Sequence, residues 1–199
     1  MDLADVHGAA AAILRAAGYD EDDVPGSIAI ARTLLGPDCI ARGGAASTVS
    51  LGGRHRIVIP RRCSPAEINF LVAHEAAEWW LRREGYDGED VEDVANAIAA
   101  SLVAPRRAFA AAVQEHGHDY PALAELFCAT ESCVALRVGE VMGDPVALVA
   151  PNRVRARGEA YEWPPEPELR RAANTDPSPP GLARYRLRDD ARRVVLRAS

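Results

Sequence analysis

The sequence contains no lysine, so all 23 of its basic residues are arginine. Together with the many alanines, this absence indicates a coding bias rather than a function. Aromatic residues are also few, at 6%, but the hydrophobic content of 48% and the charged content of 26% are ordinary for a globular protein. A chain of 199 residues is long enough for one core with a small appendage.

Long apolar runs are missing, since no stretch approaches the roughly 18 residues that a membrane-spanning helix needs. The N-terminal residues 1–5 are acidic where a secretory signal would be positive. The cysteines have no C-x-x-C spacing: Cys39, Cys63, Cys128 and Cys133. This spacing favours core packing in a reducing cytosol over a disulfide or metal framework. We therefore expect a cytoplasmic protein that does not associate with membranes.

Charge is unevenly distributed along the chain. Residues 1–150 carry a net charge of −10 and residues 151–199 a net charge of +4. A basic C-terminal segment could contact nucleic acid, but an arginine-rich tail that folds back on an acidic body is the more common arrangement. Direct nucleic-acid binding is therefore not expected.

The most informative motif is the sequence His74-Glu75-Ala76-Ala77-Glu78, in a segment from Pro65 to Arg83 that we expect to be an amphipathic helix. Ser64 and Glu67 predict a capping box at its start. In zinc peptidases of the H-E-x-x-H type, two histidines four residues apart hold the metal, and the glutamate beside the first polarises the metal-bound water. Here Glu78 replaces the second histidine, and a carboxylate is also a zinc ligand.

Glu75 falls within the apolar stripe of this helix, where a carboxylate is costly unless it is paired, protonated or bound to a metal. His74 and Glu78 are four residues apart and lie along the same face. The alternative is that the two glutamates pair with arginines such as Arg82 and that His74 is a satisfied core histidine. The five-residue motif alone favours this alternative.

A second helix, expected from about Asp90 to Val103, supports the metal hypothesis. Glu92 follows Glu78 by 14 residues, near the start of this helix, where a gluzincin-type site takes its third ligand. Asn96 lies one turn further on and could hydrogen-bond a liganding histidine. Asp93 is an alternative ligand, and an acid in the first turn also stabilises a helix through its dipole.

The segment Phe70 to Glu78, followed by Glu92 to Pro105, resembles the core of the ImmA/IrrE family of metallo-endopeptidases. In that family a helix with H-E-x-x-H precedes a helix of the form E-x-E-A-N-x-F-A-A-x-L-L-M-P. The strands expected at Ser47–Leu51 and His55–Ile59, and a short two-helix element at residues 121–141, extend the resemblance to about residues 25–142. The chain departs from the family pattern at three positions: Glu78, Val94 and Ile98.

The resemblance implies a zinc-dependent hydrolase of the bacterial cytosol, a protease that cleaves a helix-turn-helix repressor and so regulates transcription of mobile-element or stress-response genes. It implies His74, Glu78 and Glu92 as metal ligands and Glu75 as the general base, with Asn96 as a hydrogen-bonding neighbour of the ligands. Because two of these ligands are anionic, manganese or another divalent metal is also expected to bind. The alternative is an inactive pseudo-peptidase that has lost its metal and acts as a protein-binding regulatory module.

We therefore predict an α+β fold with a helical zincin-like core, of minimal gluzincin type, on a small and mainly antiparallel sheet. Residues 1–143 would form the metallopeptidase-like domain, which includes the two-helix element at 121–141. Residues 144–199 would form a small β-rich extension with proline- and arginine-rich loops. The sequence does not single out an oxyanion donor, and the candidates are His55, His116, His118 and Tyr120.

Overall fold

The computed structural model describes residues 3–51, 54–157, 161–175, 181–188, 190 and 194–198. The chain divides into two compact units, residues 1–109 with 127–129, and residues 110–126 with 130–199. The division falls within helix α5 (Arg106–His116). Helices and two small sheets make up an α+β fold, as the sequence predicts. The predicted domain boundary after residue 143 stays a prediction.

The first unit begins with helices α1 (Leu3–Ala16) and α2 (Ser27–Leu35), which precede a three-stranded sheet. The strands are β1 (Ile40–Gly43), β2 (Ser47–Leu51) and β3 (Arg54–Pro60), in the order β1-β3-β2. Strands β2 and β3 are antiparallel, and residues 52 and 53 between them lie outside the described residues. Strand β1 runs parallel to β3 and was not predicted, because four residues are too few for an alternating pattern.

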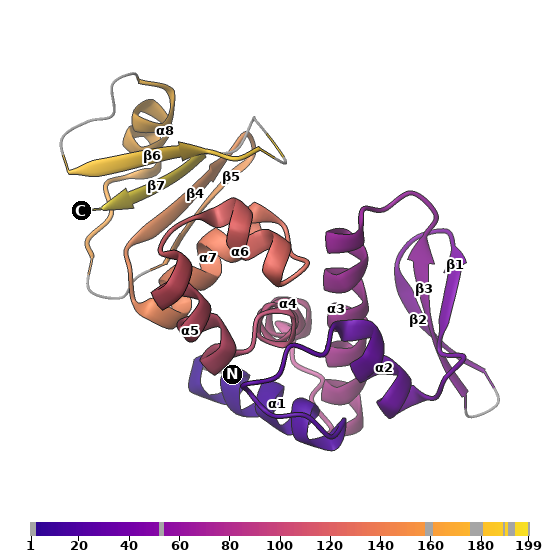
Figure 1. The fold of residues 1–199 in the computed structure, drawn as a ribbon. Coiled ribbons are helices and arrows are strands. Elements are labelled where there is room, and N and C mark those ends of the chain that lie inside the picture. Colours follow the sequence, from indigo (N-terminus) through magenta and orange to yellow (C-terminus); the bar gives the residue numbers. More distant parts are fainter. Residues whose placement is uncertain are drawn as a thin grey trace. The chain divides into compact units, whose positions relative to one another are not determined.

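The motif helix is α3 (Pro65–Arg83), and it begins with the predicted capping box. Ser64 Oγ accepts a hydrogen bond from the Glu67 backbone N–H at 3.3 Å, and Glu67 Oε2 accepts one from the Ser64 N–H at 2.7 Å. Helix α3 stands between the three-stranded sheet and helix α4 (Val91–Val103) (Figure 1). Both predicted helices are therefore confirmed within one residue at each end.

Two sides of α3 are buried for different reasons. Val72 and Ala76 join a core cluster with Ile57 and Ile59 of β3, so the apolar stripe faces the sheet. Helix α3 also packs against α4, and both helices carry fully buried alanines: Ala73, Ala77, Ala95 and Ala99. Small side chains allow helix axes to approach closely, which brings the polar residues of α3 near the first turn of α4.

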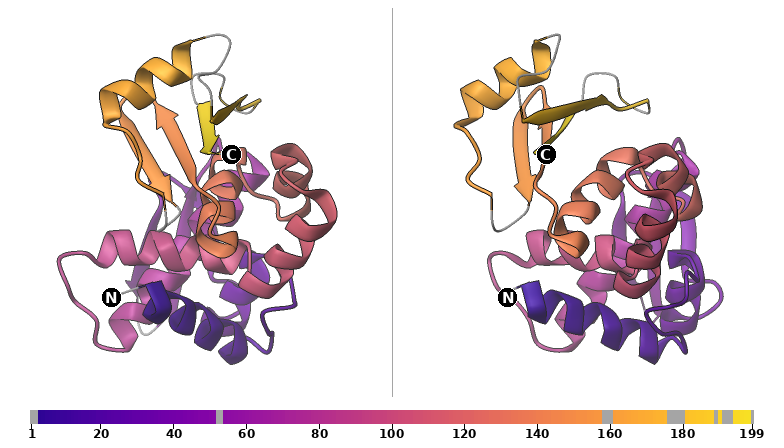
Figure 2. Two further views of the ribbon diagram at one scale, coloured as in Figure 1. Left: turned by 90° about the vertical axis from the view of Figure 1, so that its left-hand side faces the viewer. Right: turned by 60° about the vertical axis from the view of Figure 1, so that its left-hand side comes forward.

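The second unit contains helices α6 (Tyr120–Leu126) and α7 (Glu131–Met142) and a four-stranded antiparallel sheet (Figure 2). Its strands, in the order β5-β4-β7-β6, are β4 (Val146–Ala150), β5 (Arg153–Arg157), β6 (Leu182–Arg186) and β7 (Val194–Ala198). Thr130 caps α7 by accepting a hydrogen bond from Cys133 N–H at 3.2 Å. The two short helices and the C-terminal strands were predicted from the sequence.

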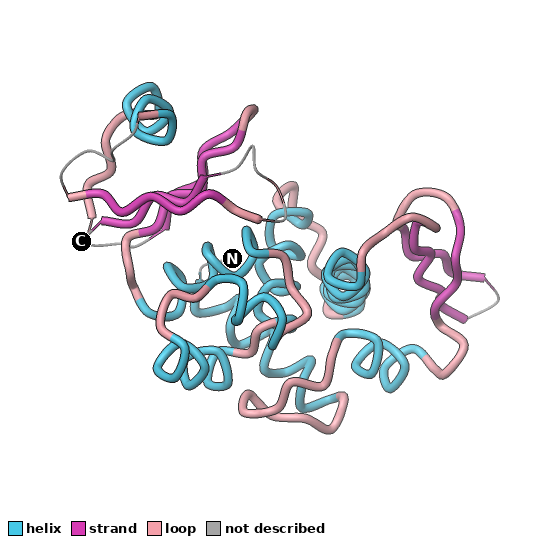
Figure 3. The backbone as a smooth tube through the Cα atoms, turned by 45° about the horizontal axis from the view of Figure 1, so that its top comes forward, coloured by secondary structure: helices cyan, strands magenta, loops and turns pink. Residues whose placement is uncertain are grey.

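Helix α8 (Glu166–Asn174) was not predicted (Figure 3). The prolines around it suggested a loop, but proline fits the first turn of a helix, where its missing N–H has no helical partner. Its buried residues Leu169, Ala172 and Ala173 pack on Ala147, Val149, Val194 and Leu196 of the sheet. Residues 161–163, which precede α8, form no strand.

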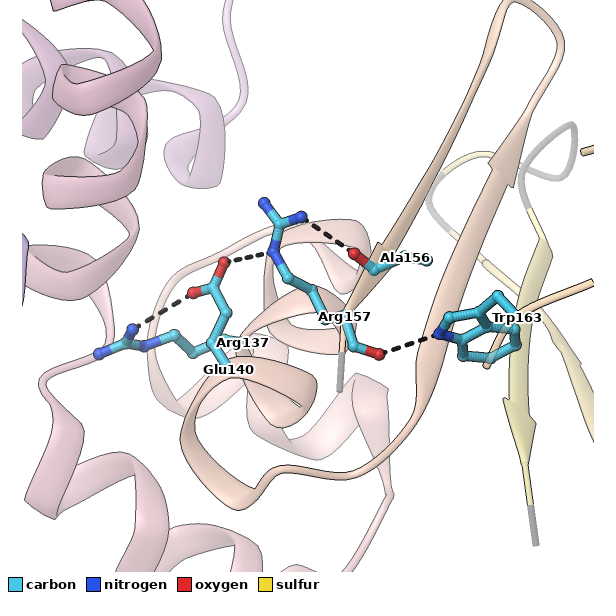
Figure 4. A network of polar contacts seen from close by, with 5 residues as sticks. All are labelled: Arg137, Glu140, Ala156, Arg157 and Trp163. Carbon is cyan, nitrogen blue, oxygen red and sulfur yellow. Dashed lines mark hydrogen bonds and ion pairs between the residues drawn. The ribbon is translucent and has the colours of Figure 1, made fainter. Parts of the chain in front are cut away.

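A polar network joins α7 to strand β5 (Figure 4). Glu140 accepts from Arg137 Nη1 at 3.3 Å and from Arg157 Nε at 2.9 Å, and the side chain of Arg137 is only 1% exposed. Trp163 Nε1 donates to the Arg157 carbonyl at 3.3 Å. Helix α7 and strand β5 approach closely at Gly139, where an added Cβ would lie 2.6 Å from Arg157 Cβ.

None of the helices that the structure describes is long and apolar enough to cross a membrane.

Candidate metal centre

Three polar residues of α3 converge on one point. His74, Glu75 and Glu78 offer ligand atoms that all lie within 4.8 Å of one another. His74 is 8% exposed and Glu75 is 4% exposed, while the Glu78 side chain is 16% exposed. Helical spacing explains the cluster, because residues four apart point the same way and the intervening Glu75 lies beside them.

Glu92 reaches the cluster from the first turn of α4. Its Oε2 lies 3.6 Å from Nε2 of His74, which is near but longer than a hydrogen bond. The Glu92 side chain is 70% exposed, so it approaches the buried histidine from the solvent side. Asn96, one turn further along α4, lines the same cavity as these acids. Asp93, the alternative ligand, is not among the residues that line the cavity.

The cavity has a volume of about 380 Å³, which is within the range of ligand-binding sites and more than a single ion needs. Its walls come from the segment before and within β2 and from helices α3 and α4. They are formed by Ala46, Ser47, Thr48, Phe70, Leu71, His74, Glu75, Glu78, Arg82, Glu92 and Asn96. The sequence predicted His74, Glu75, Glu78, Glu92 and Asn96 as site residues, and the structure brings all five to this cavity.

The carboxyl group of Glu75 is buried and hydrogen-bonded. Burial raises its pKa most, and the nearby Glu78 raises it further. A hydrogen bond from Thr48 Oγ1 to Glu75 Oε2 at 2.8 Å lowers the pKa, as do the charges of His74 and Arg82. The net shift is upward, which is the direction that suits a group exchanging protons near neutral pH.

Thr48 is a site residue that the sequence did not reveal. It lies on β2, which was predicted, and a hydroxyl on a strand just before the motif helix is the signal that could have drawn attention to it. The contact itself depends on how the edge strand packs on α3, because Thr48 and Glu75 are 27 residues apart.

The alternative explanation of the motif holds only for Glu78, which forms an ion pair with Arg82 one turn along the helix. Glu75 instead accepts a hydrogen bond from Thr48. His74 is not a satisfied core histidine, because its buried Nδ1 has no hydrogen-bond partner in the described part of the chain. An unsatisfied buried polar group costs about 1–3 kcal/mol, so its presence favours a ligand-binding role.

These residues fit a divalent cation. One imidazole and several carboxylates form a donor set that zinc accepts and that oxygen-preferring metals such as manganese also accept. The lining acids are Glu75, Glu78 and Glu92, and Arg82 is the one arginine in the described cavity wall. A cation bound by His74 would compensate the excess negative charge of these acids.

None of the candidate oxyanion donors is among the residues that line this cavity. His55 Nδ1 lies 2.8 Å from Ser50 Oγ, and its ring packs edge-on against Trp79 with centroids 5.6 Å apart. The other three candidates, His116, His118 and Tyr120, belong to the second unit. There His118 Nε2 lies 2.6 Å from Asp144 Oδ2, and burial raises the pKa of Tyr120 to about 12.

Two consecutive helices that present a His-Glu-x-x-Glu cluster and a downstream glutamate define a metallopeptidase-like site. The sequence matches the IrrE N-terminal-like domain, a peptidase family, over residues 39–138. This match covers half of the chain, from the segment before β1 into α7, so the protein belongs to the ImmA/IrrE family of metal-dependent peptidases.

A transcriptional regulator from Mycobacterium tuberculosis has a similar structure, with a TM-score of 0.58 and 14% sequence identity. The similarity covers 80% of this chain and 57% of that one, so the present chain spans less than two thirds of the regulator. At this identity the similarity concerns the fold. No curated protein sequence matches the chain significantly.

Proposed function

We propose that the protein is a divalent-cation-dependent endopeptidase that cleaves another protein. The observation that carries the proposal is that His74, Glu75 and Glu78 each offer a ligand atom within 4.8 Å of the other two. In this proposal His74, Glu78 and Glu92 hold the cation, Glu75 is the general base, and Asn96 hydrogen-bonds the ligands. Membership of a peptidase family supports these roles.

The bound cation, zinc or another divalent metal, would act as a Lewis acid that acidifies water and polarises a peptide carbonyl. Glu75 supplies the proton transfers. Thr48 holds the Glu75 carboxylate through Oε2, and the carboxylate keeps lone pairs that can take a proton from the attacking water. The new bond joins the water oxygen to the carbonyl carbon. When the C–N bond breaks, Glu75 passes the proton to the departing amine.

The substrate that we propose is a cytosolic protein, such as a helix-turn-helix repressor whose cleavage relieves repression of stress-response or mobile-element genes in a bacterium. The cavity is larger than an ion requires, which leaves room for part of a peptide. Family membership supports a protein substrate, and a transcriptional regulator shares the fold.

The test is metal analysis of the purified protein followed by incubation with a co-encoded repressor. We expect about one divalent cation per chain and cleavage at a single region. Glu75→Gln should keep the metal and lose activity by at least about 10²-fold, because only the base is removed. Absence of both metal and cleavage in the wild type would refute the proposal.

A second candidate is a pseudo-peptidase that uses the cavity to bind a regulatory partner without cleaving it. The ion pair between Arg82 and Glu78 favours it, because the second ligand position is already neutralised. Under this candidate, Glu78→His should confer metal binding that the parent lacks. A parent that already holds stoichiometric metal, and loses it on His74→Ala, would exclude the second candidate.

A further inference from the structure

Arg82 lies one turn beyond Glu78 on α3, and both residues line the cavity. The two side chains form an ion pair in which Glu78 is 16% exposed and Arg82 is 62% exposed. The guanidinium therefore approaches the carboxylate from solvent and covers it at the cavity wall. A histidine at position 78, as in H-E-x-x-H proteins, would not attract an arginine in this way.

The positive charge of Arg82 acts on the cluster as well as on Glu78. It is among the charges that lower the pKa of Glu75. A guanidinium stays charged at any physiological pH, so it cannot leave the cluster by losing a proton. A divalent cation that approaches Glu78 would meet this fixed positive charge and be repelled by it.

We propose that Arg82 and the divalent cation compete for Glu78. In the metal-free protein Arg82 compensates the carboxylate, and the cation must displace the guanidinium to use Glu78 as a ligand. The inference rests on the proposed function, because it requires Glu78 to be a cation ligand. An exposed arginine is suited to this exchange, since pairs of this kind hold weakly and the released guanidinium is easily solvated.

Arg83 provides a matched control. It is the next residue of the same helix, its side chain is 59% exposed, and its loss changes the net charge equally. Its guanidinium lies 5.5 Å from the ring centroids of Trp79 and Trp80, and Arg83 does not line the cavity. An effect confined to Arg82 would therefore reflect its position and not the total charge.

The experiment measures Zn²⁺ and Mn²⁺ dissociation constants on the metal-stripped full chain, by competition with a chromophoric chelator. We expect Arg82→Gln to bind each metal about tenfold more tightly, through loss of the ion pair and of the like-charge repulsion. Arg82→Met should behave in the same way, and Arg82→Lys should remain close to the wild type. Arg83→Gln should stay within about twofold, and the Arg82 effect should shrink at high salt.

A double-mutant cycle links the effect to Glu78. In a Glu78→Gln background, Arg82→Gln should change metal affinity far less than it does in the wild type. Equal effects of Arg82→Gln and Arg83→Gln would overturn the inference, as would weaker metal binding by both neutral Arg82 variants. Metal binding by Arg82→Gln alone would support it most strongly. If every variant, including the wild type, fails to bind metal, the proposed function fails, and the competition with it.

Discussion

Thr48 Oγ1 donates a hydrogen bond of 2.8 Å to Oε2 of Glu75, and so the edge strand β2 holds the carboxylate of the motif helix. This hydrogen bond fixes the orientation of the buried Glu75 carboxylate. Among the described hydrogen bonds, Thr48 is its side-chain donor. A general base must be held in one orientation to act on a water molecule, so this contact connects the small sheet to the proposed chemistry.

Replacing Thr48 with valine keeps the shape of the side chain and removes the hydroxyl. We expect the variant to lose about 1–3 kcal/mol of unfolding free energy, because a buried carboxylate oxygen loses its donor. Urea unfolding of the metal-free protein measures the change. Thr48→Ser retains the donor and is the control. Equal stability of the valine and serine variants would show that the hydrogen bond contributes nothing.

The charged carboxylate of Glu75 should destabilise the metal-free protein at neutral pH. Its folded-state pKa lies above the ordinary value of 4.5, mainly through burial, so the folded protein holds this proton more tightly than the unfolded chain does. Stability therefore falls as the pH rises from 4.5 through the folded-state pKa, and the cost is complete above it.

It follows that Glu75→Gln should be more stable than the wild type at about pH 7, by about 1 kcal/mol, a typical gain when a functional group is replaced. The difference should disappear near pH 4, where both side chains are neutral. Unfolding free energies of the two metal-stripped proteins at the two pH values measure it. A wild type that is the more stable at pH 7 would contradict the assigned direction of the pKa shift.

Asn69 is a buried hydrogen-bonding hub on α3. Its Oδ1 accepts from Ser27 N–H at 2.9 Å, and its Nδ2 donates to the carbonyls of Phe127 and Cys128 at 3.2 Å each. Asn69→Asp has the same shape but sets an oxygen against two carbonyls, so we expect a loss of about 3 kcal/mol. The same change at the exposed Asn174 should cost less than about 1 kcal/mol. Similar unfolding midpoints for the two variants would contradict the stabilising role of the Asn69 hydrogen bonds.

Two helical glycines should respond in opposite ways to alanine. At Gly139 an added Cβ would lie 2.6 Å from Arg157 Cβ, and we expect Gly139→Ala to lose about 1–3 kcal/mol through overpacking of α7 on β5. At Gly8 in α1 nothing lies within 4 Å of the added atom, so Gly8→Ala should gain up to about 1 kcal/mol. Thermal unfolding of both variants tests the pair, and stabilisation at Gly139 would show that β5 can move away.

The sequence predicted the elements whose signals are local. The capping box at Ser64 and Glu67 predicted the start of α3. The spacing of His74, Glu75 and Glu78 predicted that one imidazole and two carboxylates of this helix lie close together. Helix α8 was missed because proline suits both loops and the first turn of a helix. Strand β1 was missed because it is short and because its partner, β3, is not the next strand in the sequence.

By itself, the sequence determined which residues of α3 would cluster, since the helical repeat fixes their directions. Only the tertiary structure decided their surroundings. It brought Thr48 from β2 to Glu75, set Glu92 3.6 Å from His74, and left the buried Nδ1 of His74 without a partner among the described residues. These contacts depend on how α3 packs against a strand and a second helix, and such packing follows from buried surface shared by distant segments, which no local spacing encodes.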